Sequence, residues 1–174
     1  MILLKSVLFH RHQGGFTALE MIVSLLISSI IALGAAMANT QVLTQTARNN
    51  DYTTASRSTL NAIQWIGTDA QMAQTITPGV NAGFPLTLAW IEWDSTSNTV
   101  VYTLEDGKLK RSYTVDGGAP RQTLIAEYIN PDEDLTYCTT DNGTLTLMIT
   151  ASVGQGAKVV DVTKIREITS RPNL

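Results

Sequence analysis

The chain has 174 residues, which is enough for one domain plus a membrane anchor, and its formal net charge is −3 at pH 7. This acidic balance argues against binding to nucleic acid over the whole surface, although Lys108, Lys110 and Arg111 form one local basic cluster. Cys138 is the single cysteine, so an intrachain disulfide is excluded and an extracytoplasmic fold would depend on packing alone.

Catalytic residue types are scarce. Both histidines, His10 and His12, lie in the leader that precedes a Gly-Gly pair. Removal of that leader would leave a chain without the commonest general base and the commonest transition-metal ligand. No Gly-rich phosphate loop follows a predicted strand, and no nucleophile has an accompanying base. The sequence therefore predicts no enzyme activity and no cofactor.

The first predicted element is a membrane-length apolar helix. Met21 to Ala38 is rich in Leu, Ile, Val, Ala and Met, and no charged residue lies between Glu20 and Arg48. Because a helix needs about 20 apolar residues to cross a bilayer, we expect a transmembrane segment at about residues 21–41. The basic leader before it favours a cytoplasmic N-terminus.

Three interpretations of this N-terminus compete. Ala36-Met37-Ala38 matches the small-x-small cleavage pattern of a secretory signal peptide, but Glu20 interrupts the approach to the apolar core. A plain signal anchor would place Glu20 at the membrane interface. The third interpretation is cytoplasmic cleavage at the junction of Gly14, Gly15 and Phe16, directly before the helix.

The third interpretation explains Glu20 physically. Cleavage would leave a charged amine on Phe16, and a carboxylate four residues later lies on the same helix face. A charge at membrane depth costs about 2.5–3.5 kcal/mol on insertion scales, and such groups usually pair. Glu20 would pair either with its own N-terminus or, in a staggered bundle of helices, with a neighbour's.

The segment Gly15-Phe16-Thr17-Ala18-Leu19-Glu20-Met21, followed by an apolar helix, resembles the class III signal of type IV pilins and type II secretion pseudopilins. The resemblance implies cleavage after Gly15 by a prepilin peptidase, N-methylation of Phe16 by the same enzyme, and use of Glu20 as the carboxylate of filament assembly. Many major pilins have a proline midway through the apolar segment. Here Gly34 is the nearest weak point in the helix.

Helical periodicity continues beyond the membrane. Apolar and small residues recur at steps of three and four up to Ile76, while Asp69 is expected to lie mostly off this stripe with the other polar residues. Pro78-Gly79 is expected to end the helix, which would then span residues 16–77. Trp65 and Met72 fall off the stripe, which suggests packing under a loop or contact with a neighbouring subunit. The predicted stripe consists of Tyr52, Ala55, Thr59, Leu60, Ile63, Ile66, Ala70, Ala73 and Ile76.

From Leu86 the period changes to two, which predicts strands. Asp106-Gly107 between two β-rich runs is a strong hairpin signal, and Asn142-Gly143 opens a further strand. Short turns between strands imply a mainly antiparallel sheet. The predicted fold is α+β, with one long N-terminal helix whose first half is transmembrane, packed on that sheet. The predicted domains are a cleaved leader (1–15), the helix (16–77) and an extracytoplasmic β-rich domain (78–174).

A second resemblance lies in the helix and the following strands. The helix contributes Arg57-x-x-Leu60-x-x-Ile63 with Asp69 and Ala73, and the strands contribute Val101-Tyr102-x-Leu104, then Gly107-x-Leu109-x-Arg111. Together these segments look like J-type minor pseudopilins of type II secretion and W-type minor pilins. From the residues alone, Arg111 is expected to be a solvated strand residue and Tyr102 an aromatic on a sheet face.

Asp132, Glu133 and Asp134, with Asp141 nearby in sequence, offer oxygen ligands of the kind that calcium prefers. Their spacing is not that of an EF-hand loop, and acidic loops are usually just solvated. The prediction is therefore that no metal is bound, with this loop as the one candidate.

The sequence thus predicts a structural subunit, of minor type, of a type IV pilus or type II secretion pseudopilus, which initiates or caps assembly. It would be a single-pass protein of the cytoplasmic (inner) membrane with its C-terminal domain outside the cytoplasm. The expected partners are prepilin peptidase, other pilins or pseudopilins through helix bundling, and an inner-membrane assembly platform. The alternative is a signal-anchored extracytoplasmic binding domain that does not polymerise.

Overall fold

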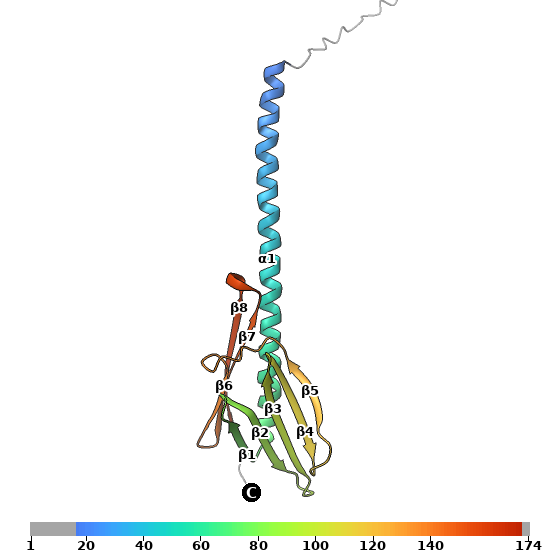
Figure 1. The fold of residues 1–174 in the computed structure, drawn as a ribbon, viewed down its shortest axis with the longest axis vertical. Coiled ribbons are helices and arrows are strands. Elements are labelled where there is room, and N and C mark those ends of the chain that lie inside the picture. The colour runs from blue at the N-terminus through green and yellow to red at the C-terminus, as the bar shows by residue number, and fades with distance from the viewer. Residues whose placement is uncertain (1–16, 172–174) are drawn as a thin grey trace, which may run out of the picture. The chain divides into compact units, whose positions relative to one another are not determined.

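A computed structural model describes residues 17–171 of the chain. It divides into two compact units, with the boundary between Gln45 and Thr46. Helix α1 (Ala18–Met72) runs through that boundary, and eight strands follow it (Figure 1). The predicted α+β, pilin-like fold with one long N-terminal helix on antiparallel sheet is therefore confirmed, and each unit is described by itself below.

The described part of the first unit, residues 17–45, is helical and every side chain in it is exposed. Its hydroxyl groups are satisfied within the helix, because serine and threonine side chains donate to carbonyls three or four residues earlier. Examples are Ser28 Oγ to the carbonyl of Ser24 at 2.7 Å and Ser29 Oγ to that of Leu25 at 2.7 Å. These bonds need no water, so the serines are compatible with an apolar surrounding. The helix continues without a break through Gly34.

In the second unit, one face of α1 is buried. Within α1 the stripe differs from the prediction at five positions. Tyr52 and Leu60 are exposed, whereas Ala62, Gly67 and Asp69 are buried on the stripe. Since successive residues are about 100° apart on a helix of 3.6 residues per turn, Leu60 points well away from Thr59, which holds the stripe position. The buried residues of α1 are Ala55, Thr59, Ala62, Ile63, Ile66, Gly67, Asp69 and Ala70.

The helix ends at Met72, earlier than the predicted Thr77. The following segment forms strand β1 (Thr75–Gly79), which pairs antiparallel with β2 (Gly83–Ile91). The residues Thr75, Ile76 and Thr77 are β-branched, and such side chains favour an extended backbone over a helix. Pro78 is tolerated because β1 is the first strand of its sheet and has a free edge.

Five strands form the first sheet in the order β1-β2-β3-β4-β5. The remaining members are β3 (Ser97–Glu105), β4 (Lys108–Val115) and β5 (Arg121–Ala126). The predicted hairpin at Asp106-Gly107 is confirmed, with φ of 50° and 70° at these two residues. Positive φ at both central positions is what a tight type I′ hairpin turn requires.

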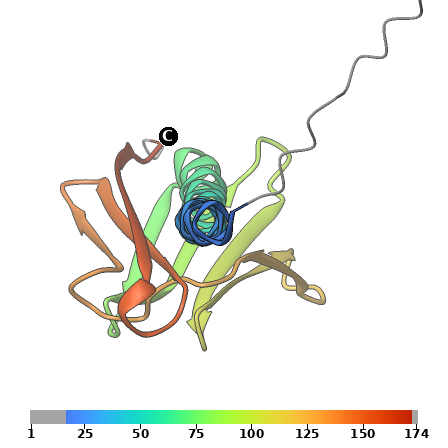
Figure 2. The same ribbon diagram turned by 90° about the horizontal axis from the view of Figure 1, so that it is seen from above.

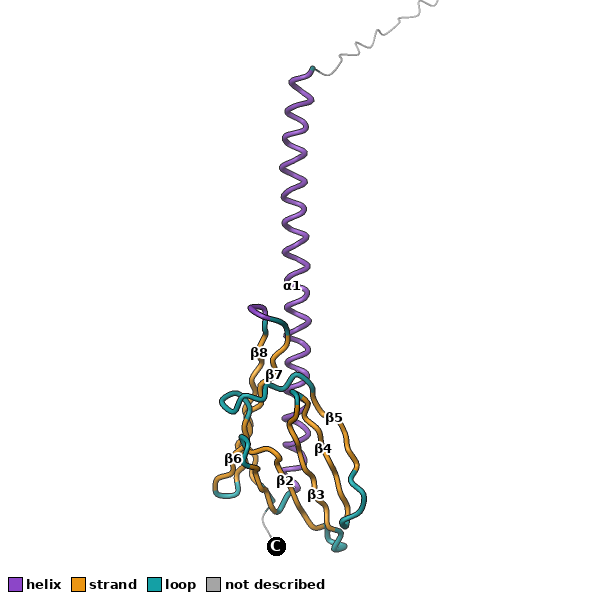
Figure 3. Tube along the Cα trace, viewed as in Figure 1, coloured by secondary structure: helices purple, strands orange, loops and turns teal. Residues whose placement is uncertain are grey.

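A second sheet contains three antiparallel strands in the order β6-β7-β8, so the single predicted sheet is in fact two. Strand β6 (Tyr137–Asp141) was not predicted, whereas β7 (Thr144–Val153) is the strand predicted after Asn142-Gly143, and β8 (Val160–Thr169) pairs with it. Asn142-Gly143 turns β6 into β7, and a short 3₁₀ helix, η1 (Gly156–Lys158), lies between β7 and β8. Figure 3 separates these strands from the loops that join them.

The second part of α1 lies in the angle between the two sheets, as the end-on view in Figure 2 shows. Its small buried residues, such as Ala55, Ala62 and Ala70, meet larger side chains from the strands, such as Leu88 and Leu147, in one core. The small residues let the backbone of the helix approach both sheets closely. The two sheets are also joined directly, because the N–H of Cys138 on β6 donates to the carbonyl of Ala82 at 2.8 Å.

Candidate functional site

Thr17 caps the N-terminus of α1. Its Oγ1 accepts a hydrogen bond of 3.3 Å from the N–H of Glu20, and its carbonyl accepts one of 3.2 Å from the N–H of Met21. A threonine before the first helical residue, with a glutamate three positions later, is the capping-box pattern of a helix start. This signal is present in the sequence as Thr17-Ala18-Leu19-Glu20, so the helix start at Ala18 is encoded by local residues.

Glu20 therefore lies in the first turn of the helix and is exposed. A carboxylate in this position interacts favourably with the positive end of the helix dipole, by about 0.3–1 kcal/mol at an exposed site. That is less than the cost of a charge at membrane depth, so the helix end alone compensates Glu20 only in part. Gly14, Gly15 and Phe16 lie outside the described residues, so the proposed pairing of Glu20 with the amine of Phe16 stays a prediction.

A buried ion pair is the principal polar feature of the second unit. Arg111 on β4 donates from Nε to Asp69 Oδ2 at 2.7 Å and from Nη2 to Asp69 Oδ1 at 3.0 Å. The hydroxyl of Tyr102 on β3 donates to the same Oδ2. The side chains of Arg111 and Asp69 are only 14% and 4% exposed. Three elements, α1, β3 and β4, thus meet at one carboxylate.

Aromatic rings enclose the guanidinium of Arg111. Its Cζ lies 5.3 Å from the ring centroid of Trp65 on α1 and 4.9 Å from that of Tyr113 on β4. Tyr113 in turn stacks on Trp90 of β2, with ring centroids 6.3 Å apart. A cation over an aromatic face contributes about 0.5–2 kcal/mol, more where the site is desolvated. Trp65 therefore packs on Arg111 rather than under a loop.

These contacts correct two predictions. Arg111 is not a solvated strand residue, and Tyr102 is more than an aromatic on a sheet face, because its hydroxyl binds Asp69. Burial and the charge of Asp69 raise the pKa of Tyr102, so its hydroxyl stays a donor. Burial lowers the pKa of Arg111, but hydrogen bonds to Asp69 and its charge raise it more, and the net shift is upward. The sequence contained one signal for the burial of Asp69. Asp69 follows Ile66 by three residues and directly precedes Ala70, which places it near the apolar face of the helix.

This cluster has the character of a structural joint. No buried side-chain nitrogen or oxygen atom among the described residues lacks a hydrogen-bond partner. The carboxylate of Asp69 accepts three hydrogen bonds from Arg111 and Tyr102 and its side chain is only 4% exposed, so it binds within the fold rather than facing a ligand. The arrangement fixes the helix to the sheet and offers no evident group for catalysis.

The acidic loop lies just before β6. Asp132 Oδ1 accepts a hydrogen bond of 3.0 Å from the N–H of Asp134, and Asp132 itself donates from its N–H to Asn130 Oδ1 at 3.0 Å. Asp141 is the last residue of β6. Among residues 17–171, no group of three or more His, Cys, Asp or Glu side chains is arranged to hold a metal ion, so the structure does not bring Asp132, Glu133, Asp134 and Asp141 together as one site.

Comparison with known proteins identifies the N-terminal segment. Residues 10–36 match the family model of the prokaryotic N-terminal methylation motif. No curated protein and no solved structure matches the chain. The matched segment contains Gly14, Gly15, Phe16 and Glu20 and continues into the apolar part of α1, where a window of 18 residues has a mean hydropathy of 2.3 and is entirely unburied.

The motif and the long apolar helix together indicate a membrane-anchored precursor of the type IV pilin and pseudopilin class. Proteins of this class are structural, and the motif implies processing by prepilin peptidase and assembly with other pilins.

Proposed function

We propose that this chain is a subunit of a type IV pilus or type II secretion pseudopilus that enters the assembly through α1 after its leader is removed. The observation that supports this is the methylation motif at residues 10–36, which leads into a helix with Glu20 in its first turn. The proposed domains are the leader (1–15), the helix from Phe16 with its transmembrane part at about 21–41, and the β-rich domain outside the cytoplasm.

The proposed maturation has two chemical steps at one residue. Prepilin peptidase hydrolyses the peptide bond between Gly15 and Phe16, and the new amine of Phe16 then takes a methyl group from a sulfonium-type methyl donor and releases a proton. Methylation keeps the positive charge of the amine, so it remains a partner for the carboxylate of Glu20.

Glu20 then acts as the assembly carboxylate. In an isolated subunit its compensation is limited to the helix end and its own N-terminus. In a staggered bundle it also meets the amine of a neighbouring subunit, and the gain is larger in lipid than in water because opposite charges attract more strongly at low dielectric. The apolar side chains of residues 21–45, all exposed in the single chain, provide the surface on which the helices pack.

We further propose that the subunit is of the minor type, resembling J-type pseudopilins or W-type pilins. Asp69, Tyr102 and Arg111, three residues behind that resemblance, lie together in one buried cluster. The resemblance therefore involves residues that hold the helix on the sheet in this chain, which supports a likeness of fold. A role at the start or tip of the assembly rests on the resemblance alone.

The experiment combines mass measurement with incorporation. The mature protein should begin with methylated Phe16, and Gly15→Val should block this processing. Glu20→Gln should be processed normally yet be absent from sheared filaments or pseudopili, while Asp51→Asn, on the same helix beyond the apolar run, serves as the matched control and should be incorporated. A chain beginning at Asn39, or normal maturation of Gly15→Val, would support a secreted or merely anchored domain instead.

A further inference from the structure

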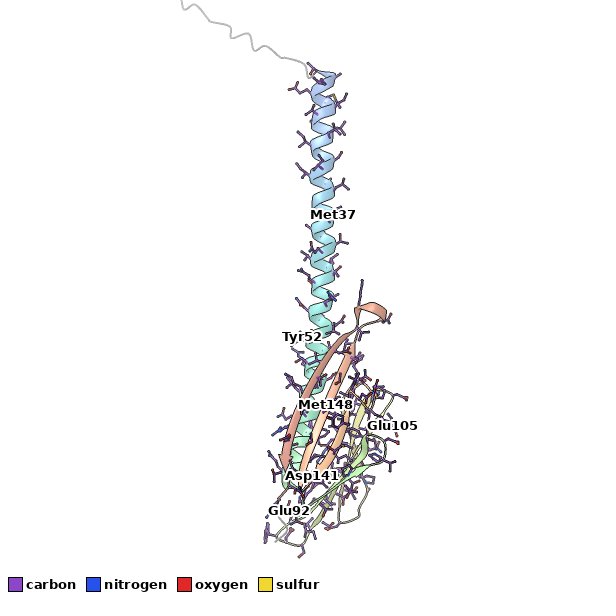
Figure 4. The ribbon with its side chains drawn as sticks, turned by 90° about the vertical axis from the view of Figure 1, so that its left-hand side faces the viewer. Met37, Tyr52, Glu92, Glu105, Asp141 and Met148 are labelled. Atoms are coloured by element: carbon purple, nitrogen blue, oxygen red, sulfur yellow. The ribbon has the colours of Figure 1, made fainter. Side chains whose placement is uncertain are left out.

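The outer face of the three-stranded sheet has a continuous row of large apolar side chains. Tyr137 on β6 is opposite Met148 on β7, and Met148 is opposite Ile165 on β8. Their neighbours Cys138 and Leu147 are buried in the core, and side chains alternate between the faces of a sheet, so this row faces away from the core. The side chain at the edge of the row, Ile165, is 64% exposed, whereas Tyr137 and Met148 are half-buried. Strands β7 and β8 are nearest the viewer in Figure 4, where Met148 is labelled.

The charged side chains on this face are all acidic. Rows toward the β6–β7 turn contain Glu167 and Asp141, and the row at the opposite end contains Asp161; the other outward positions are threonine or serine. The basic residues of β8, Lys164 and Arg166, hold the alternate positions. Arg166 indeed lies over the helix, with its Nη1 2.7 Å from where a Cβ on Gly67 would be.

The outer face of the five-stranded sheet has a different composition. Its central rows join Ala89 to Thr99 and Thr114, and Thr87 to Val101 and Ser112. These residues are small or hydroxylated, so this face lacks a row of large apolar groups. Ile91 and Leu124, which are exposed on this sheet, lie in different rows, opposite Ser97 and Lys110. The β6-β7-β8 face differs in that large apolar residues are paired across all three of its strands.

We propose that this face, defined by Tyr137, Met148 and Ile165 with Asp141, Asp161 and Glu167 at its rim, docks a different protein whose surface has an apolar centre surrounded by lysine or arginine. Charge complementarity selects this occupant. In a face-to-face pair of identical chains, acidic rims would meet without basic groups on the same face, which is unfavourable. The proposal concerns a surface separate from Glu20 and the cleavage site, so it is independent of how the chain is anchored.

The dimensions indicate a reversible contact. Strands of five, ten and ten residues, about 4.8 Å apart and at about 3.3 Å per residue, present an area of about 400 Å². Burial of that area on each partner is at the small end of specific interfaces, where transient complexes are found. A covalent trap in living cells is therefore a better assay than purification of a complex.

The test places a photo-crosslinking amino acid at Ile165 of the full chain in its native cells, with Thr99 on the other outer face as the matched control position. We expect an adduct with one other protein from position 165, at least tenfold above that from position 99, and a crosslinked peptide that has lysine or arginine beside apolar residues. Glu167→Lys should reduce the adduct about tenfold, and an acidic substitution of the crosslinked partner's basic residue should restore it.

Each other outcome overturns the proposal. An adduct between two copies of this chain would show a homotypic surface. Equal adducts from positions 165 and 99, or an adduct that Glu167→Lys leaves unchanged, would show contact without charge selection. Absence of an adduct at 165, with normal processing and abundance of the chain, would show that the face is unoccupied.

Discussion

Asp69 and Arg111 are 42 residues apart in sequence, yet their two parallel hydrogen bonds join helix α1 to strand β4. Fork-to-fork pairing of a guanidinium and a carboxylate fixes orientation as well as distance. The guanidinium carbon of Arg111 also lies over the aromatic rings of Trp65 and Tyr113. The pair therefore sets how the second part of α1 lies against the five-stranded sheet.

Arg111→Ala is expected to destabilise the domain strongly. The substitution leaves the carboxylate of Asp69 buried with Tyr102 as its remaining side-chain partner, and breaking a buried ion pair from one side costs about 3–5 kcal/mol. The free energy of unfolding is measured by urea titration of the full chain in detergent, followed by tryptophan fluorescence. Arg111→Lys keeps the charge but loses the fork geometry, so an intermediate loss is expected.

Lys110→Ala is the matched control for this substitution. Lys110 is the neighbouring residue on β4 and pairs with Glu105 at 3.0 Å, but both of these side chains are well exposed. An exposed pair contributes about 0–1 kcal/mol. If Arg111→Ala cost no more than Lys110→Ala, the cluster would not be the joint that its geometry indicates.

Tyr102→Phe isolates the third member of the cluster. The ring stays in the core and only the hydroxyl donor to Asp69 is lost, so the expected cost is about 1.5–3 kcal/mol, typical of a hydrogen bond to a charged group. The same unfolding titration measures it. Because the two donors share one acceptor oxygen, the effects of Tyr102→Phe and Arg111→Lys should not add in the double variant. Strict additivity would indicate that the two donors act independently.

Cys138 is expected to resist alkylation in the folded chain. Burial raises the pKa of its thiol from 9.0 to about 12, and the thiolate is the reactive form. Iodoacetamide at pH 8 should therefore modify Cys138 slowly until urea unfolds the domain, as followed by intact mass. Since the sequence has one cysteine, every modified chain reports this site. Rapid alkylation without denaturant would contradict the burial of β6 against the β1–β2 turn.

The same thiol predicts a loss of stability at high pH. A group whose pKa is higher in the folded state favours folding while it is protonated, so its contribution is complete below pH 9 and is lost as the pH rises from about 9 to about 12. Unfolding titrations across this range should show a smaller decline for Cys138→Ala than for the natural chain. Tyr102, whose pKa is also raised, remains in both chains and makes the comparison specific to Cys138. Identical declines would show that this thiol does not contribute.

Local patterns in the sequence identified the elements that depend on neighbouring residues. The uncharged run before Arg48 indicated the first part of α1, and Asp106-Gly107 indicated the hairpin between β3 and β4. Strand β1 was missed because the apolar stripe of the predicted helix continues at helical spacing through Ile76. Its pairing partner, β2, begins only at Gly83, and local residues do not indicate that pairing. Strand β6 was missed because Tyr137–Asp141 contains a single strongly buried residue, Cys138.

The candidate sites divide in the same way. The junction at Gly15, Phe16 and Glu20 could be proposed from the sequence because its chemistry lies within one short segment, and its roles stay predictions. The cluster of Asp69, Tyr102 and Arg111 required three separate elements to meet, and nothing in the sequence alone states which strands face the helix. A buried carboxylate is normally costly, so its presence on the helix stripe is explained only by the guanidinium that the fold brings to it.

Gly83 tests the junction between the two sheets. It has φ of +87°, and a Cβ on it would be 2.1 Å from the carbonyl oxygen of Cys138 and 2.4 Å from Sγ. Gly117, with φ of +67° and no atom within 4 Å of its Cβ position, is the matched control. Gly117→Ala should cost about 1–2 kcal/mol, the strain of a left-handed backbone with a side chain. Gly83→Ala adds displacement of the β6 backbone to that strain, so a further loss of about 1–3 kcal/mol is expected.

Because the N–H of Cys138 bonds to the carbonyl of Ala82, this displacement should also speed the alkylation of Cys138, which Gly117→Ala should leave slow. Equal unfolding free energies for the two variants would show that the close approach of β6 to the β1–β2 turn can relax freely.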